Sequence, residues 1–176
     1  MELNSKVIQL PSSKQSLMAS LDGKIVKYYV KEGDLVKKGD KVALIQSIEL
    51  SRMSAEYLAL KEQLKSMEEN YNGNLILNKR DIVSKQELNL LNIQRKDISA
   101  KLETIISQLK TLDIEVKDIK NTISEYTLFA HNSGIVSSLL KTEYSAVSKD
   151  TEIASIVKEK SFYLKSYLPI AYSEYL

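Results

Sequence analysis

The 176-residue chain contains no cysteine, one histidine, two prolines and five glycines. The absence of cysteine excludes a disulfide framework, a thiol nucleophile and a thiolate metal site, and it is compatible with an oxidising compartment. No apolar run approaches the ~20 residues that a membrane-spanning helix needs, and no signal peptide is present, so we expect an exported form to have lost its targeting segment. The 25 basic and 23 acidic residues are well mixed, which gives no footprint for nucleic acid.

No arrangement of residues typical of an enzyme is present. The chain has no Ser/His/Asp constellation, phosphate-binding loop or cluster of metal ligands. His131 stands alone beside an expected β turn, where a histidine is far more often a surface or packing residue than a ligand. Met53 and Met67 fall on a helical seam, and Met1 and Met18 are too few for a thioether site. We therefore expect neither enzymatic activity nor a bound cofactor or metal.

Residues 49–123 carry an apolar repeat that predicts two long helices. The apolar positions are alternately three and four residues apart, and a repeat of 3.5 residues keeps one narrow seam against one partner, as in a coiled coil. The only polar member is Arg95, which we expect either to snorkel outward or to pair across the hairpin with Glu62 or Glu69. The seam consists of Leu50, Met53, Tyr57, Leu60, Leu64, Met67 and Tyr71 in the first arm and of Leu88, Leu91, Arg95, Ile98, Leu102, Ile105, Leu109, Leu112, Val116, Ile119 and Ile123 in the second.

The two arms are predicted to fold back on each other as an antiparallel hairpin with its tip at about 78–84. Ser84 followed by Glu87 is a capping-box pattern, so the second helix should begin at Ser84. Folding the chain about residue 81 leaves residues 113–123 overhanging, where β-branched side chains make a helix less favourable. An arm of about 30 residues would project roughly 45 Å.

Short strands punctuated by turns flank the hairpin on both sides. In residues 18–48, alternating apolar residues are separated by two Gly-Asp turns, which indicates a compact β module. Residues 127–157 repeat this pattern at an offset of 111. The offset aligns Gly23 with Gly134, Ile25 with Val136, Val36 with Val147, Val42 with Ile153, Ala43 with Ala154 and Ile45 with Ile156, whereas the turn glycines Gly33 and Gly39 fall on Tyr144 and Asp150.

Neither half of this repeat is expected to fold by itself, because half a β module has open edges and little core. The two halves are therefore predicted to join in one small β-sandwich, with the hairpin inserted between them. Near the termini, a short strand is expected at about 3–10, and residues 162–168 show the alternation of a single strand. Because a single strand cannot stand alone, these two should pair with each other or with sequence outside this chain.

This order of segments resembles the periplasmic adaptor proteins, also called membrane fusion proteins. The resemblance rests on Asp22–Val26 and Glu32–Asp40 for the first half, on Ala130–Val136 for the second, and on Ser47–Leu50 with Ala55–Leu58 at the start of the hairpin, which is similar to adaptors of the heavy-metal branch of resistance–nodulation–division pumps. It implies an α+β fold in which an antiparallel coiled-coil hairpin is inserted between two halves of a lipoyl/biotinyl-like β-sandwich. The implied segments are an N-terminal strand (1–17), the first lipoyl-like half (18–48), the hairpin (49–123), the second half (124–158) and the start of a β-barrel domain (159–176).

The resemblance also points to partner-binding residues at the hairpin tip, where the family carries an Arg, a Leu and a Ser that contact the channel. Ser84 takes the Ser position and Leu77 the Leu position, but the Arg position falls on Gly73, so no guanidinium is available there. Lys79 and Arg80 are candidates to compensate. A glycine in a helical arm costs about 1 kcal/mol relative to Ala, so Gly73 is also a candidate for a bend or an end of the arm. The full set of candidates is Gly73, Leu77, Lys79, Arg80, Ser84 and Gln86.

The resemblance implies a periplasmic adaptor that links an inner-membrane efflux transporter to an outer-membrane channel and is anchored to the inner membrane at full length. No Met-Lys-Met or Asp-Lys-Ala sequence occurs, so a swinging lipoyl or biotinyl cofactor is not expected. Adaptors of ABC-type exporters and type I secretion systems share the architecture, and a coiled-coil tether without a transport role is the competing class. Self-association into a ring or sheath would use apolar residues that lie off the seam. The alternative is that these residues only widen the seam of an isolated hairpin. They are Leu75, Leu77, Leu90, Ile93 and Ile106.

Overall fold

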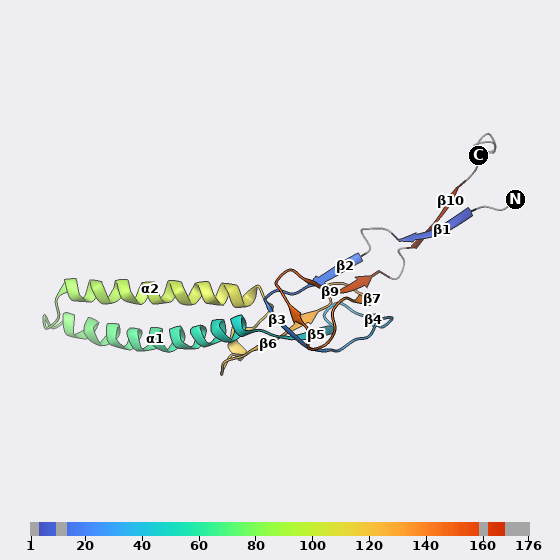
Figure 1. Ribbon diagram of the computed structural model, residues 1–176. Coiled ribbons are helices and arrows are strands. Elements are labelled where there is room, and N and C mark those ends of the chain that lie inside the picture. The colour runs from blue at the N-terminus through green and yellow to red at the C-terminus, as the bar shows by residue number, and fades with distance from the viewer. Residues whose placement is uncertain (1–3, 10–13, 159–161, 168–176) are drawn as a thin grey trace, which may run out of the picture. The chain divides into compact units, whose positions relative to one another are not determined.

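The computed structural model describes residues 4–9, 14–158 and 162–167. They form two long helices and antiparallel sheets, which confirms the α+β class (Figure 1). The contacts divide the chain into two compact units, 46–126 and the combination of 1–45 with 127–176. The elements are β1 (Asn4–Gln9), β2 (Lys14–Met18), β3 (Gly23–Tyr28), β4 (Leu35–Val36), β5 (Lys41–Gln46), α1 (Ile48–Asn78), α2 (Lys85–Lys110), a 3-10 turn η2 (Val116–Asp118), β6 (Glu125–Phe129), β7 (Gly134–Leu139), β8 (Ala146–Val147), β9 (Glu152–Val157) and β10 (Phe162–Tyr167).

Helices α1 and α2 run antiparallel beside each other, as predicted (Figure 1). Each begins at a serine cap, since the hydroxyl of Ser47 accepts from the backbone N–H of Leu50 and that of Ser84 from the N–H of Glu87. Every predicted seam residue within the two helices is buried or half-buried. The seam prediction is therefore confirmed for the helical part of the hairpin.

Two details of the predicted arms are wrong. Helix α2 ends at Lys110, and the chain beyond it forms only the short 3-10 turn η2 before β6 begins. The ending is a Schellman motif, in which Asp113 adopts the left-handed conformation (φ 57°) and the N–H of Ile114 bonds the carbonyl of Leu109. Gly73 does not end the first arm either, because α1 continues through it to Asn78.

Arg95 has a different partner across the hairpin from the expected carboxylate. Its guanidinium lies 4.7 Å from the centre of the Tyr71 ring on α1 and donates a hydrogen bond to Asn92, so its partner across the hairpin is an aromatic face and not Glu62 or Glu69. A cation over a ring keeps part of its charge in water while covering apolar surface. This explains how an arginine is accommodated in an otherwise apolar seam.

The chain returning from α2 is fixed to the start of α1 by buried serines. Ser54 is fully buried, and its hydroxyl accepts from the N–H of Ile123 at 3.0 Å while lying 3.1 Å from the Ile123 carbonyl. The N–H of Ser47 bonds the carbonyl of Ser124 at 2.7 Å. Residues 123 and 124 are therefore bonded to the start of α1, and the overhanging segment after η2 is not helical, in line with its β-branched content.

The β module has two four-stranded sheets, and each contains strands from both sides of the hairpin. One sheet has the order β2-β9-β7-β4 and the other β6-β5-β3-β8. Strands β6 to β9 begin and end 111 residues after β2 to β5, and replacing each strand by its counterpart converts one sheet order into the other. The prediction that the two halves combine into one folded unit is confirmed, with an internal twofold pattern.

The turns of the two halves also correspond, although their residues differ. Gly33 and Gly39 have positive φ of 90° and 91°, and their counterparts Tyr144 and Asp150 also have positive φ, of 64° and 62°. A left-handed backbone is common for glycine and tolerated by Asp but unfavourable for a tyrosine. The two halves thus share the same backbone conformation at two turn positions where their amino acids differ.

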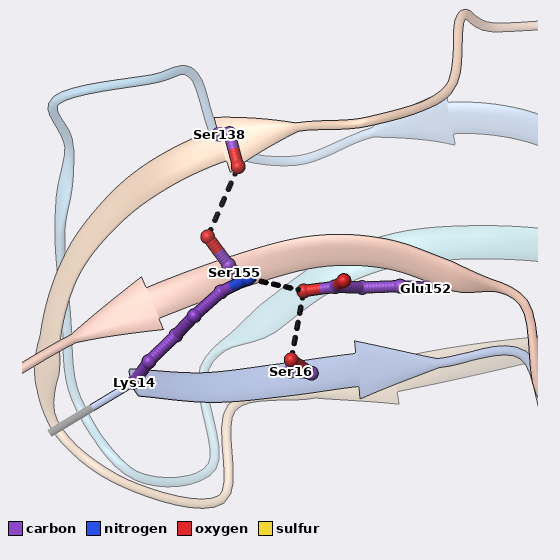
Figure 2. Close-up of polar contacts among 5 residues, drawn as sticks. All are labelled: Lys14, Ser16, Ser138, Glu152 and Ser155. Carbon is purple, nitrogen blue, oxygen red and sulfur yellow. Dashed lines mark hydrogen bonds and ion pairs between the residues drawn. The ribbon is translucent and has the colours of Figure 1, made fainter. Parts of the chain in front are cut away.

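The core of the module is apolar, with a small number of paired polar groups. One cluster joins Leu17, Val36, Val42, Ala130, Val136, Ala154 and Ile156, which come from both halves. Figure 2 shows the polar contacts beside it: the buried Ser155 shares a hydrogen bond of 3.0 Å with Ser138, and Glu152 accepts from Ser16 at 2.7 Å and pairs with Lys14 at 3.1 Å. The bond from Ser16, followed by that from Lys14, lowers the pKa of Glu152.

Strands β1 and β10 pair in antiparallel register from Asn4 opposite Tyr167 to Gln9 opposite Phe162. Of the two alternatives that the sequence left open, the structure shows the pairing of the two terminal strands with each other. Residues 168–176, at the end of the segment expected to begin a β-barrel domain, lie outside the described residues.

Tyr28 provides a pH-dependent test of the contact between the halves. Its hydroxyl donates to the carbonyl of Lys141 at 2.9 Å, and burial followed by the charge of Glu143 raises the pKa of Tyr28 to about 12. Because the folded chain holds this proton more tightly than the unfolded chain, the protonated Tyr28 should stabilise the module fully below pH 10 and lose this contribution as the pH rises from about 10 to 12.

The prediction is that a Tyr28→Phe variant loses less unfolding free energy between pH 9 and 12 than the parent chain, as measured by urea unfolding at each pH. Tyr29→Phe serves as the control, since Tyr29 is 42% exposed. Parallel pH profiles for the parent and Tyr28→Phe would contradict the prediction.

Candidate functional site: the hairpin tip

The tip is a tightly closed turn made by residues 79–84. Helix α1 ends in a second Schellman motif, with Asp81 in the left-handed conformation (φ 57°) and the N–H of Ile82 bonded to the carbonyl of Leu77. The amide of Asn78 donates to the carbonyl of Val83 at 2.6 Å. The turn is therefore stabilised by its own hydrogen bonds, which fixes the direction of the side chains that it presents.

Ser84 connects this turn to α2. Its backbone is extended (φ −71°, ψ 153°), and its hydroxyl oxygen accepts from the N–H of Glu87 at 3.1 Å, as the capping pattern predicted. Ser84 is exposed, and a hydroxyl that accepts one bond can still donate its proton to a second group. Its role as a helix cap therefore does not exclude a bond to a partner.

The structure brings five of the six predicted site residues together at the tip. Leu77 is 37% exposed, and Lys79, Arg80, Ser84 and Gln86 are exposed as well. Gly73 lies one helical turn before Leu77 on an exposed part of α1, with no atom within 4 Å of the position that its Cβ would take.

The sequence interpretation missed two exposed apolar side chains in this region. Ile76 is 56% exposed and Ile82 is 67% exposed. Leu90 and Ile93 on α2, which the sequence had already placed off the seam, are 62% and 63% exposed. Ile76 could have been found because it lies outside the three-four seam of α1. Ile82 could not, because its exposure depends on the left-handed turn at Asp81.

The electrostatics of the tip are basic. Residues 79–85 carry Lys79, Arg80 and Lys85 against the single acid Asp81, a formal charge of +2. Exposed apolar side chains surrounded by charged ones are typical of a protein-binding surface. The chemistry available at the tip is thus apolar contact, a serine hydroxyl and cationic donors.

A shallow groove of about 360 Å³ lies between the helices, farther from the tip. Its floor contains Leu60, Met67 and Ile98, and Gln63, Gln94, Asp97 and Lys101 line its rim. Asp97 and Lys101 form an ion pair of 2.7 Å on α2. The groove offers a second surface of mixed polarity on the hairpin.

Within the part of the chain that the structure describes, no group of three or more His, Cys, Asp or Glu residues could hold a metal ion. Among the same described residues, no helix has the length and hydropathy of a membrane span.

No protein-family model matches the chain, and no curated protein matches it either. Solved structures do match, and they define the fold. The chain has the fold of the membrane fusion, or periplasmic adaptor, proteins, in agreement with the resemblance of its sequence motifs.

Three of the matching solved structures align with nearly all residues of this chain. ZneB from Cupriavidus metallidurans has a TM-score of 0.71 and 13% identity over 98% of this chain and 71% of its own. A MacA-MexA chimera that contains the Pseudomonas aeruginosa MexA α-hairpin domain has a TM-score of 0.60 and 20% identity over 97% and 59%. The membrane fusion protein Spr0693 from Streptococcus pneumoniae has a TM-score of 0.54 and 17% identity over 100% and 72%. At these identities the likeness concerns the fold.

Proposed function

We propose that this chain is part of a periplasmic adaptor that links an inner-membrane efflux transporter to an outer-membrane channel. The observation that carries the proposal is a capped, closed hairpin inserted between two halves of one β module, in a chain with the membrane fusion protein fold. In this proposal the β module is the family's lipoyl-like sandwich, and β1 with β10 begins its β-barrel domain. The full-length protein would be periplasmic and anchored to the inner membrane.

The proposed mechanism is mechanical. The coiled-coil seam makes the hairpin a stiff spacer, and the tip docks on helical ends of the channel. Several copies would pack side by side into a ring or sheath. The exposed apolar side chains at the tip, Leu77 and Ile82, support the docking step, because apolar surface with polar residues beside it favours contact with another protein.

Cysteine cross-linking can test tip docking, because the chain has no cysteine of its own. In cells that carry the full-length protein and its channel, we expect a Gln86→Cys variant to form an adduct with the channel through a short bifunctional reagent. Ser84→Cys is a second tip variant, which also reports on the cap. Lys65→Cys, an exposed position in the middle of α1, is the matched control and should give none.

Adducts from Lys65→Cys with none from either tip variant would reject tip docking. No adduct with the channel from any position, together with a cytosolic location of the protein, would favour the coiled-coil tether instead. An adduct from the tip in a strain whose transporter is of the ABC type would retain the adaptor role and change the transporter class.

A further inference from the structure

The surface through which the two halves of the β module join has a twofold pattern that the proposed function does not use. We call residues 14–46 the first half-module and residues 125–157 the second. Backbone hydrogen bonds between them occur in matched pairs related by the offset of 111. The N–H of Ala19 donates to Thr151 and that of Ala130 to Asp40, both at 2.9 Å; Gly33 donates to Val136 and Tyr144 to Ile25, both at 2.8 Å; Gly39 donates to Ala130 and Asp150 to Ala19, both at 2.8 Å.

Four of the side-chain bonds that cross between the half-modules also form matched pairs. The bonds of Tyr28 with Lys141 and of Ser16 with Glu152 are not matched, because Leu139 stands at the position aligned with Tyr28 and Lys41 at that aligned with Glu152. In each matched pair of bonds, both half-modules contribute one side-chain acceptor and one backbone N–H donor. Glu32 accepts from the N–H of Leu139 at 2.8 Å and Glu143 from that of Tyr28 at 2.9 Å, while Asp22 accepts from Lys149 at 2.6 Å and Ser133 from Lys38 at 3.2 Å.

Core side chains are matched in size at the aligned positions where both residues are buried. At the two of these positions where the residues differ, the first half-module has Ile25 and Val42, whereas the second has Val136 and Ile153. One methylene group has moved between the positions, so each half contributes the same core volume there. Cores accept changes that conserve volume at a cost usually below about 1.5 kcal/mol.

From these observations we infer that the surface through which the first half-module binds the second is self-complementary. In place of its own second half-module, this surface can bind the first half-module of a second copy of this chain. In that arrangement Glu32 of one chain would accept from Tyr28 of the other, Asp22 from Lys38, and the strand order of the sheets would be unchanged. The inference does not depend on a role in transport.

Charge selects between the two occupants. The first half-module has seven lysines and four acidic residues, a formal charge of +3, and the second has two lysines and four acidic residues, a charge of −2. Unlike halves attract each other, whereas two first half-modules repel. Because salt screens exposed charges over about 10 Å at 0.1 M, the pairing of like halves between chains should increase with ionic strength.

The register supplies a direct test. Ser16 of β2 lies opposite Ser155 of β9, and the position of Ser155 corresponds to Leu44 in the first half-module. Opposed residues of antiparallel strands are close enough for a disulfide. One full-length chain carrying Ser16→Cys and another carrying Leu44→Cys are unfolded, mixed, refolded and oxidised at 0.05 M and 1 M salt. We expect a disulfide-linked dimer whose yield rises at least twofold at high salt.

Two controls set the scale. A single chain carrying both Ser16→Cys and Ser155→Cys should form the bond within the chain, which verifies the native register after refolding. A mixture of Ser16→Cys and Ser107→Cys chains measures random collision, since Ser107 lies on an exposed part of α2. A yield for the Ser16→Cys and Leu44→Cys mixture that equals this background at both salt concentrations would overturn the inference, and so would a yield that falls with salt.

Discussion

Replacing Gly134 by alanine is expected to destabilise the β module by about 1–3 kcal/mol, toward the upper end of that range. A Cβ at this position would overlap the carbonyl oxygen of Val157 and lie 2.8 Å from Cγ2 of Ile156. The nearest atom belongs to the backbone of β9, which β7 pairs with, so the clash cannot be relieved by a side-chain rotation. Urea unfolding followed by circular dichroism measures the effect.

Gly73→Ala is the matched control for this prediction. Gly73 lies in the interior of α1 with no atom within 4 Å of its Cβ position. The same substitution should therefore stabilise the hairpin by roughly 0.5–1 kcal/mol, because alanine loses less backbone entropy than glycine in a helix. Equal unfolding midpoints for Gly134→Ala and the parent chain would contradict the close approach of β7 and β9.

The second large effect is expected at Leu109, in the last turn of α2. Its side chain is 0% exposed, and a fully buried leucine truncated to alanine typically costs about 2–5 kcal/mol through lost burial and the cavity that remains. Leu109→Ala should therefore lower the thermal midpoint of helix unfolding by several degrees. The measurement is the helical circular dichroism signal on heating.

Leu90→Ala changes the same residue type on the same helix at a position that is 62% exposed. Its stability should remain within about 0.5 kcal/mol of the parent chain, as for most surface substitutions. If Leu90→Ala were as destabilising as Leu109→Ala, the apolar residues off the seam would belong to the hairpin's own core. That result would remove the main argument for a partner at the tip.

The hairpin was largely predictable because its signals are local. The three-four spacing from Leu50 to Tyr71 depends only on helical geometry, and the seam residues within both helices are buried or half-buried. The cap at Ser84 likewise depends on residues within one turn. The end of α2 was missed, because a Schellman motif with Asp113 in the left-handed position replaces the glycine that normally marks such an ending.

Pairing across the chain was less accessible. Arg95 was expected to snorkel or to find a carboxylate, but the Tyr71 ring occupies the place that faces it across the hairpin. The candidate site was predicted through Leu77 and Ser84, whereas the exposure of Ile82 follows from the turn at Asp81 and has no signature in the residue pattern. The docking role of these residues stays a prediction.

The sequence by itself determined the periodic features: the seam, the capped start of α2, and two strand-rich segments repeated at a fixed offset. The seam, the cap and the strand alternation follow from interactions between residues a few positions apart, which leave a local pattern in the chain. The offset follows from comparing the patterns of the two strand-rich segments. Only the tertiary structure decided that each sheet takes strands from both halves, and that Tyr144 adopts the left-handed conformation of its counterpart Gly33. Such features are set by hydrogen bonds between segments separated by about a hundred residues, and a bond of that kind constrains the backbone without specifying the side chain.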